Sequence, residues 1–282
     1  MKQEIIYLYD RYTHSEMDRR TFLERLALLV GSTAMASRVL NQLENNYALA
    51  KASDPSLVTE NISFSSPFGP VQGFLAQKTP DQKKPGVVVI HENRGLNPYI
   101  QDVARQLAQD GFLALAPDAL SLKGGTPTDS DQARHLIGEL DPDQARSFFV
   151  SAIQFLARHT SCQGKVGVVG FCWGGAMANQ MAIYSPLLAA SVAFYGRQPV
   201  AEDVPKIHVP LQLHYGELDE RINAGIDSFQ TALDEAKKDY AIFRYPEANH
   251  AFHNHTNPAR YNAQAAQLAW ERTLEFFRKH LQ

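Results

Sequence analysis

Lys165-Val-Gly-Val-Val-Gly-Phe-Cys172-Trp-Gly-Gly-Ala176 is the part of the chain that most narrowly limits its architecture. A valine-rich apolar run, typical of a buried strand, leads into a glycine-flanked cysteine, and a helical pattern follows at once. This is the Gly-x-Ser-x-Gly arrangement of a nucleophile elbow, with cysteine in the serine position. We therefore expect a strand, a sharp turn and a helix, with the Cys172 thiol held on the turn.

The small residues around Cys172 have a chemical reason. A nucleophile on a strained turn needs close approach of neighbouring backbone, and Gly170 and Gly174 carry no side chain that would clash. The N-terminus of the following helix favours negative charge on a thiolate or an oxyanion. The backbone N–H of Trp173 is then a candidate oxyanion-hole donor. A buried free cysteine in an ordinary strand-to-helix turn is the alternative explanation of the same pattern.

Short apolar strands alternate with helical stretches on both sides of this motif. Continuous runs of Val, Ile and Leu between helices are typical of a parallel sheet covered on both faces. The sequence predicts one mostly parallel, doubly wound α/β domain over residues 61–282, beginning with a hairpin of Asn61–Ser65 and Val71–Gln77. The further predicted strands are Val87–Ile90, Phe112–Ala116, Lys165–Val169, Ala190–Phe194, Leu211–His214 and Ala241–Tyr245. The predicted helices are Ile100–Gln109, Gln144–Arg158, Trp173–Tyr184, Ala224–Lys237 and Ala263–Lys279.

Composition excludes several classes of protein. The 282 residues contain 27 Lys and Arg against 30 Asp and Glu, so the net charge of −3 indicates no nucleic-acid partner. No apolar run is long enough to predict a membrane span. Two cysteines do not make a disulfide framework. Cys162 is expected roughly 20 Å from Cys172 as an inert loop thiol. An enzyme or a small-molecule binder remains.

A thiol nucleophile needs an imidazole to take its proton and a carboxylate to orient that imidazole. Asp219 follows the strand Leu211–His214, and His250 follows the strand Ala241–Tyr245. The carboxyl ends of parallel strands meet at one edge of a sheet, where ligands bind. The chain order Cys172, Asp219, His250 is the one expected of such a fold.

Neighbouring residues offer rivals for both roles. Glu217 and Glu220 flank Asp219, but the Gly-x-x-Asp spacing favours Asp219. His253 and His255 follow His250 in an H-x-x-H-x-H pattern, yet the other ligands and the helical spacing of a zinc site are absent. We expect no metal and no cofactor.

The strand Val87–Ile90 ends in His91-Glu-Asn-Arg-Gly95. This loop lies where the second oxyanion donor of the fold is expected, so the N–H of Asn93 is the candidate. Glu92 is predicted to modulate the nearby thiol.

The first 60 residues have a different pattern, which supports two hypotheses. Arg19-Arg20-Thr21-Phe22-Leu23 and the uncharged run 26–37 resemble a twin-arginine export signal, with small residues at 33–36 or 47–50 for cleavage. Charged Glu24 and Arg25 interrupt that pattern, and Arg38 ends the run early.

The alternative is a retained helical extension. Ile5, Tyr9 and Tyr12 lie at i, i+4 and i+7, and Phe22, Leu26 and Val30 follow at steps of four, as in amphipathic helices that dock on a domain. We expect residues 1–60 to be such an extension and the protein to be cytoplasmic, with export to the periplasm by the twin-arginine route as the alternative.

The motifs together resemble the dienelactone hydrolase (carboxymethylenebutenolidase) family of the α/β-hydrolase superfamily over roughly residues 60–280. The segments that carry the resemblance are His91-Glu-Asn-Arg-Gly-Leu-Asn97, Ala116-Pro-Asp118, Gly170-Phe-Cys-Trp-Gly-Gly175, Tyr195-Gly196, Gly216-Glu-Leu-Asp219, Asn249-His-Ala-Phe252 and Ala269-Trp-Glu-Arg-Thr273.

The resemblance implies an α/β-hydrolase fold and a triad of Cys172, His250 and Asp219. It implies that Glu92 interacts with the resting thiol and moves when substrate binds. The reaction would be hydrolysis of a small-molecule ester or lactone through a thioester. Two substrate-binding arginines of the family are not matched: Asn254 stands four residues after His250, with Arg260 the next arginine, and the region after Asp118 contains none nearby.

Two other functions stay open. A non-catalytic small-molecule binder on a hydrolase scaffold is the main alternative, and redox chemistry at Cys172 is weakened by the lack of a resolving cysteine. The natural substrate and the oligomeric state are not determined by the sequence.

Overall fold

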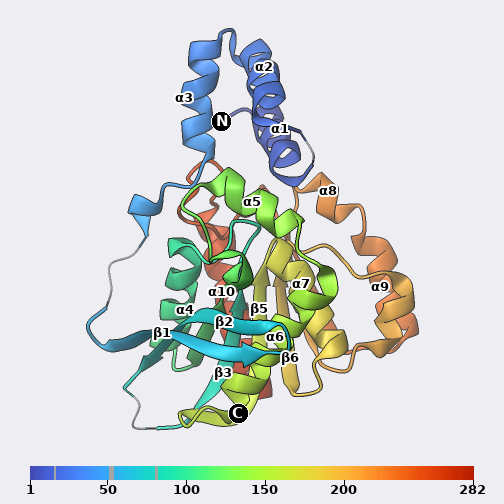
Figure 1. Cartoon of the computed structure of the whole chain (residues 1–282). Coiled ribbons are helices and arrows are strands. Elements are labelled where there is room, and N and C mark those ends of the chain that lie inside the picture. The colour runs from blue at the N-terminus through green and yellow to red at the C-terminus, as the bar shows by residue number, and fades with distance from the viewer. Residues whose placement is uncertain (16, 51–53, 80–81) are drawn as a thin grey trace.

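The computed structural model describes residues 1–15, 17–50, 54–79 and 82–282. Its described part contains an eight-stranded sheet in the order β1-β2-β4-β3-β5-β6-β7-β8. The hairpin β1–β2 is antiparallel and joins β4 antiparallel, while every pair from β4 to β8 is parallel (Figure 1). The strands are β1 Leu57–Ser66, β2 Gly69–Lys78, β3 Lys84–Ile90, β4 Leu113–Pro117, β5 Cys162–Phe171, β6 Leu188–Phe194, β7 Leu211–Gly216 and β8 Tyr240–Tyr245.

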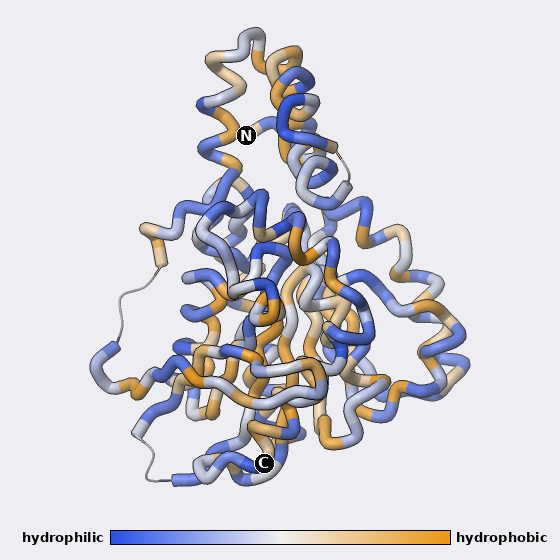
Figure 2. The backbone as a smooth tube through the Cα atoms, in the orientation of Figure 1, coloured by the Kyte–Doolittle hydropathy of each residue, from blue (hydrophilic) through white to orange (hydrophobic). Residues whose placement is uncertain are grey.

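Helices cover both faces of the sheet, as the apolar strands require. One face packs against α4 and α10, and the other against α6, α7 and α9. The strands in the middle of the sheet are mostly hydrophobic, with hydrophilic segments outside (Figure 2). The α-helices that follow the first strands of the sheet are α4 Pro98–Gln109, α5 Ser130–Gly138, α6 Pro142–Arg158, α7 Trp173–Tyr184, α8 Glu220–Asn223, α9 Ile226–Glu235 and α10 Ala263–Leu281. Short 3₁₀ turns lie at Tyr47–Leu49, Ser121–Lys123 and Ala201–Lys206. The mostly parallel, doubly wound α/β prediction is confirmed.

Side-chain caps fix where several of these helices begin. The side chain of Asn97 accepts from the N–H of Ile100, and Pro98 occupies the first turn of α4. Asn262 caps α10 in the same way, by accepting from Ala265. The loops before α4 and α10 follow β3 and β8, and therefore belong to the end of the sheet where the predicted site lies.

Three further helices, α1 Gln3–His14, α2 Arg19–Val30 and α3 Thr33–Leu43, stand at one end of the molecule (Figure 1). They share an apolar cluster of their own, in which Tyr9, Phe22 and Leu26 are fully buried. The ring of Tyr12 stacks on that of Phe22 with centroids 4.5 Å apart. The amphipathic spacing at the start of the chain therefore corresponds to packed helices.

The residues that resemble a twin-arginine export signal lie in the same three helices. Arg19 and Arg20 open α2, whose N-cap is Asp18, and the uncharged run is divided between α2 and α3 by Gly31 in the left-handed conformation. Within the described residues, no helix combines the length and apolarity needed to cross a membrane. Cytoplasmic location and export both stay predictions.

The structure corrects four details. The predicted helix Ala224–Lys237 is α9, which is shorter at Ile226–Glu235, and neither α5 nor α8 had a predicted counterpart. The division at residue 60 falls inside β1, because the strand begins at Leu57. Cys162 is not a loop thiol: it is the first residue of β5, pairs with Lys84 and is buried.

Candidate active site

Cys172 occupies a strained turn between β5 and α7. Its φ of 55° and ψ of −113° lie where side-chain-bearing residues are rarely found. A Cβ on Gly170 would lie 1.9 Å from the carbonyl oxygen of Gly174, and a Cβ on Gly174 would lie 2.3 Å from that of Ile90. The packing therefore admits only glycine two residues before and two residues after the cysteine, as the elbow pattern requires.

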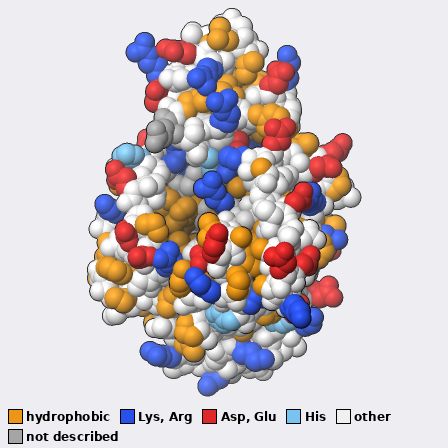
Figure 3. Space-filling model, turned by 90° about the vertical axis from the view of Figure 1, so that its right-hand side faces the viewer, with side chains coloured by type: hydrophobic (Ala, Val, Ile, Leu, Met, Phe, Trp, Pro, Cys, Tyr) orange, Lys and Arg blue, Asp and Glu red, His pale blue; other side chains and the backbone are white. Residues whose placement is uncertain are grey.

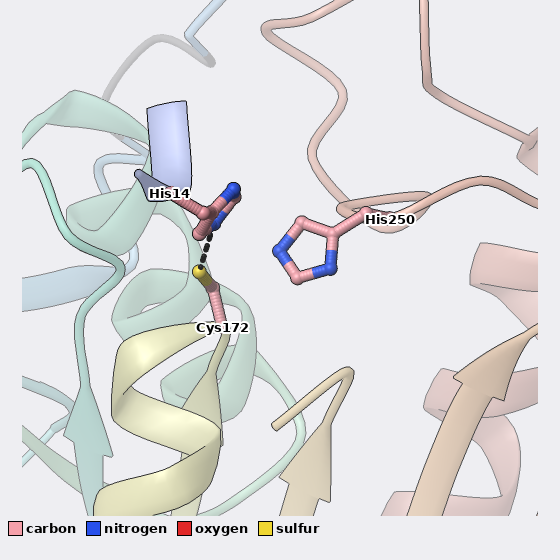
Figure 4. Close-up of side chains that lie close together, drawn as sticks. All are labelled: His14, Cys172 and His250. Atoms are coloured by element: carbon pink, nitrogen blue, oxygen red, sulfur yellow. Dashed lines mark hydrogen bonds between the residues drawn. The ribbon is translucent and has the colours of Figure 1, made fainter. Parts of the chain in front are cut away.

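His250 and Asp219 come from the loops that follow β8 and β7. Asp219 Oδ2 lies 2.5 Å from His250 Nδ1, and both side chains are almost fully buried. A ring nitrogen of His250 lies within 4.8 Å of Cys172 Sγ. The three side chains predicted from separate strand ends are thus brought together, and Figure 4 shows two of them, Cys172 and His250.

A second imidazole, which the sequence analysis did not identify, also reaches the thiol. His14, the last residue of α1, shares a hydrogen bond of 3.2 Å between its Nε2 and Cys172 Sγ (Figure 4). Its ring lies edge-on to that of His250, with centroids 4.7 Å apart. His14 Nδ1 faces Asp10, 3.0 Å from the carboxylate and 2.9 Å from the backbone carbonyl. The thiol therefore lies between two imidazoles, each paired with an aspartate.

The charges in this cluster stabilise one another. Burial alone would raise the pKa of Cys172, but the His14 and His250 charges lower it well below its usual range. Burial would lower the pKa of His250, yet Asp219, Cys172 and Asp10 raise it to about 10. Burial likewise opposes a rise in the pKa of His14, which Cys172 and Asp10 bring about. These interactions shift all three groups in the direction of their charged forms.

Glu92 lies beside this cluster but is bonded elsewhere. Its carboxylate accepts hydrogen bonds from Asn254 Nδ2 at 2.9 Å and from the Tyr195 hydroxyl at 3.5 Å. Burial and the charge of Cys172 raise the pKa of Glu92, while Arg260 opposes that rise. Among the described residues, the thiol's hydrogen bond goes to His14, where the resemblance led us to expect Glu92.

Both residues predicted to supply the oxyanion hole line the same cavity as Cys172. Trp173 is the first residue of α7, a position whose N–H has no partner within a helix. Asn93 lies in the turn after β3 and lines the same cavity as Cys172. The Asn93 side chain donates to the carbonyl of Thr13 at 2.9 Å and so ties this turn to α1.

The rival residues have other partners. The Glu217 carboxylate accepts from the N–H of Glu247. His253 bonds the Tyr99 hydroxyl at 2.9 Å, and His255 Nε2 lies 3.2 Å from Asp102. Within the described part of the chain, the donor atoms that come together as potential metal ligands are instead those of His14, Cys172 and His250, all within 4.8 Å of one another.

A cavity of about 760 Å³ opens over Cys172. In Figure 3, the N-terminal helices stand above a hollow that shows hydrophobic side chains, with Lys or Arg side chains nearby. Three arginines line the cavity. Arg134 and Arg221 pair with Asp131 and Asp10, whereas Arg197 is exposed and has no carboxylate partner among the described residues.

Asn254 does not substitute for a substrate-binding arginine. It is fully buried, and its side-chain oxygen accepts from the Thr256 hydroxyl at 2.7 Å while its amide holds Glu92. Arg260 lies next to Glu92 and Cys172 around a small adjoining cavity, with its guanidinium 5.1 Å from the ring centroid of Tyr9. Asp118 binds Leu120 and Thr126 and closes its own turn.

Fold and site together define a hydrolase of the α/β-hydrolase superfamily. The sequence profile of the dienelactone hydrolase family matches residues 71–281, and the chain belongs to that family. A second, YqhI-like profile matches residues 1–31.

Individual relatives are named for the same family or for a related lactone-hydrolysing activity. A Yersinia pestis protein named "Putative carboxymethylenebutenolidase" is 34% identical over 249 residues, covering 80% of this chain and 91% of that protein. A Bradyrhizobium protein named "Probable 2-oxo-3-(5-oxofuran-2-ylidene)propanoate lactonase" is 31% identical over 222 residues, covering 74% of this chain and 89% of its own length. The crystal structure of a "Putative Dienelactone Hydrolase" from Klebsiella pneumoniae superposes with a TM-score of 0.73 at 27% identity, over 79% of this chain and 99% of that one.

Proposed function

We propose that the protein hydrolyses carboxylic esters or lactones through a thioester on Cys172. The observation that carries this proposal is the elbow thiol facing the buried His250–Asp219 pair, in the chain order expected of the fold. The names of the relatives, which include a carboxymethylenebutenolidase and a lactonase, support the same reaction class.

The reaction would begin with attack of the Cys172 thiolate on the substrate carbonyl. The N–H groups of Trp173 and Asn93 are the proposed donors to the oxyanion that forms. Collapse of this intermediate expels the alcohol, or opens the lactone ring, and leaves a thioester. Water activated by His250 then attacks the thioester and releases the acid.

Arg197 gives an indication of the substrate. Its guanidinium lies on the cavity wall with no carboxylate partner among the described residues, and the cavity of about 760 Å³ has room for a small molecule. A small ester or lactone with a negatively charged group fits this wall best.

Cys172→Ala is the decisive variant. We expect it to abolish hydrolysis of a panel of neutral and carboxylate-bearing esters and lactones, because the acyl acceptor is lost. Cys162→Ala is the matched control: it removes the other buried thiol, at the far end of the same strand. It should keep wild-type turnover.

Circular dichroism would establish that both variants are folded. Wild-type turnover retained by Cys172→Ala would contradict the thioester. Ligand binding by a wild-type protein that turns over none of the panel would support the non-catalytic binder, and peroxide consumption faster than ester cleavage would support redox chemistry.

A further inference from the structure

We propose that His14 is a catalytic residue that holds the Cys172 thiolate, with Asp10 orienting it, so that His250 is free to act on the leaving group and on water. The inference rests on the proposed thiol mechanism. The family profile begins at residue 71 and does not include His14.

The contacts at the Cys172 thiol indicate different roles for the imidazoles of His14 and His250. His14 Nε2 makes the hydrogen bond to Sγ, at 3.2 Å. His250 Nε2 is buried and has no hydrogen-bond partner in the described part of the chain, while its Nδ1 is held by Asp219. A nitrogen that is positioned but unoccupied is suited to protonate an alkoxide or to deprotonate water.

Asp10 supports His14 through both its charge and its backbone: the hydrogen bond of His14 Nδ1 goes to the Asp10 backbone carbonyl at 2.9 Å, whereas Asp219 bonds His250 through its carboxylate. The Asp10 carboxylate lies 3.0 Å from His14 Nδ1, and its other oxygen accepts from Arg221 Nε at 2.9 Å. Both side chains of the His14–Asp10 pair are nearly buried, at 13% and 12% exposed. The arrangement fixes the ring so that Nε2 points to the sulfur.

Contacts with the hydrolase domain hold α1 in this position. The Arg94 guanidinium donates to the Tyr9 hydroxyl at 2.5 Å, and the Tyr12 hydroxyl donates to Asp131 at 2.6 Å. Asn93 bonds the carbonyl of Thr13, the residue before His14. The place of His14 is therefore set by bonds to the loop after β3 and to α5, and does not depend on its own contact with the thiol.

The helix also leaves room for a substrate. The cavity that reaches Cys172 is lined by Thr13 and His14 on one side and by Trp173 and Tyr195 on the other. Because this space is present with α1 docked, α1 forms a wall of the site and does not fill it.

Cys172, His14 and His250, with the substrate and water, account for every proton in the proposed reaction. The thiol proton passes to His14, and the resulting imidazolium stays beside the sulfur. The thiolate forms the C–S bond, and the C–O bond breaks as protonated His250 gives its proton to the leaving oxygen. Neutral His250 then takes a proton from water, the hydroxide adds to the thioester, and the C–S bond breaks to return the thiolate to His14.

Alkylation of Cys172 by iodoacetamide tests this role without any substrate. The titratable and charged groups around the thiol are His14 and Asp10 on α1, Glu92 after β3, Tyr195 after β6, Asp219 and Arg221 at α8, His250 after β8, and Arg260 in the same loop region as His250. In the wild type the rate should change little between pH 8 and pH 6, whereas an ordinary thiol would slow by about 80-fold.

His14→Asn should restore pH dependence. We expect alkylation at pH 6 to fall at least about tenfold while the rate at pH 9.5 stays near wild type, and we expect kcat to fall more than KM rises. His280→Asn, the same change in the last turn of α10, is the control and should match the wild type.

A second variant keeps the test valid if Asn disturbs the helix. His14→Ala should lose activity at pH 7 and recover part of it when imidazole is added, which a purely structural role would not allow. Wild-type alkylation profiles in both variants would overturn the proposal. Faster hydrolysis would also overturn it and would make α1 an inhibitory segment. A changed pH dependence of alkylation in the His14 variants, in a protein that hydrolyses no ester, would disprove the proposed function but would still support the pairing of His14 with the thiolate.

Discussion

Two histidine–aspartate pairs converge on one sulfur, and they are built in different ways. His250 and Asp219 follow two neighbouring strands, so the sheet itself sets their separation. His14 and Asp10 lie four residues apart on one helix, where consecutive turns place them side by side. The first pair lies within residues 71–281, which the family profile covers, and the second lies outside them. One chemical arrangement can therefore arise from tertiary topology or from helical periodicity.

Replacing each imidazole should show which pair carries the chemistry. We expect His250→Asn to lower kcat by about 10⁴-fold, since it removes the acid and base for both half-reactions. His14→Asn should lower kcat at pH 7 by roughly 10- to 100-fold, since it removes only the support of the thiolate. Steady-state kinetics on one ester would measure both. Equal losses would contradict the division of labour between the rings.

The aspartates Asp219 and Asp10, which pair with His250 and His14, allow the same comparison of the two pairs. Asp219→Asn should cost about tenfold to a hundredfold less than His250→Asn, because the imidazole remains but loses its orientation. Asp10→Asn should lower kcat by about tenfold and shift the alkylation profile in the direction of His14→Asn.

Glu4→Gln is the matched control for Asp10→Asn, since it makes the same kind of change on an exposed residue of the same helix. Glu4→Gln should leave both kcat and the pH profile of alkylation unchanged. A profile shift with Glu4→Gln equal to that with Asp10→Asn would indicate a general charge effect of α1 in place of a specific pairing.

The smallest effect on activity is expected from Tyr9→Phe. This change keeps the buried ring that packs on Tyr12 and Phe22, and removes the hydroxyl that Arg94 contacts. Losing a partner of a buried guanidinium should reduce the free energy of unfolding by about 1.5–3 kcal/mol, measured by urea denaturation. The alkylation profile should stay as in the wild type. A profile displaced as far as in His14→Asn would mean that docking of α1, and not the imidazole, sets the thiol pKa.

The sheet and the predicted triad residues were accessible from the sequence because local signals carry them. The Gly170–Gly174 elbow is a short-range motif, and the apolar strands locate Asp219 and His250 at one edge of the sheet. The exact extent of β5 was not accessible, since Cys162 becomes a strand residue only through pairing with β3. The single turn of α8, Glu220–Asn223, likewise had no predicted counterpart, because four residues are too few to show a helical period.

His14 was missed for a different reason. The helical spacing of Ile5, Tyr9 and Tyr12 predicted a docked helix but gave no information on where it docks. An ionisable pair at i and i+4, Asp10 and His14, was the available signal, and such pairs are common on exposed helix faces. Its meaning depends on long-range bonds such as that between Asn93 and Thr13, which no sequence pattern records.

The self-contained apolar cluster of α1, α2 and α3 has an evolutionary consequence. Because Tyr9, Phe22 and Leu26 pack among themselves, this segment can change or be exchanged without repacking the interior of the sheet. Under the His14 proposal, exchange of this unit would add or remove an imidazole at the thiol while the sheet that carries Cys172 keeps its packing.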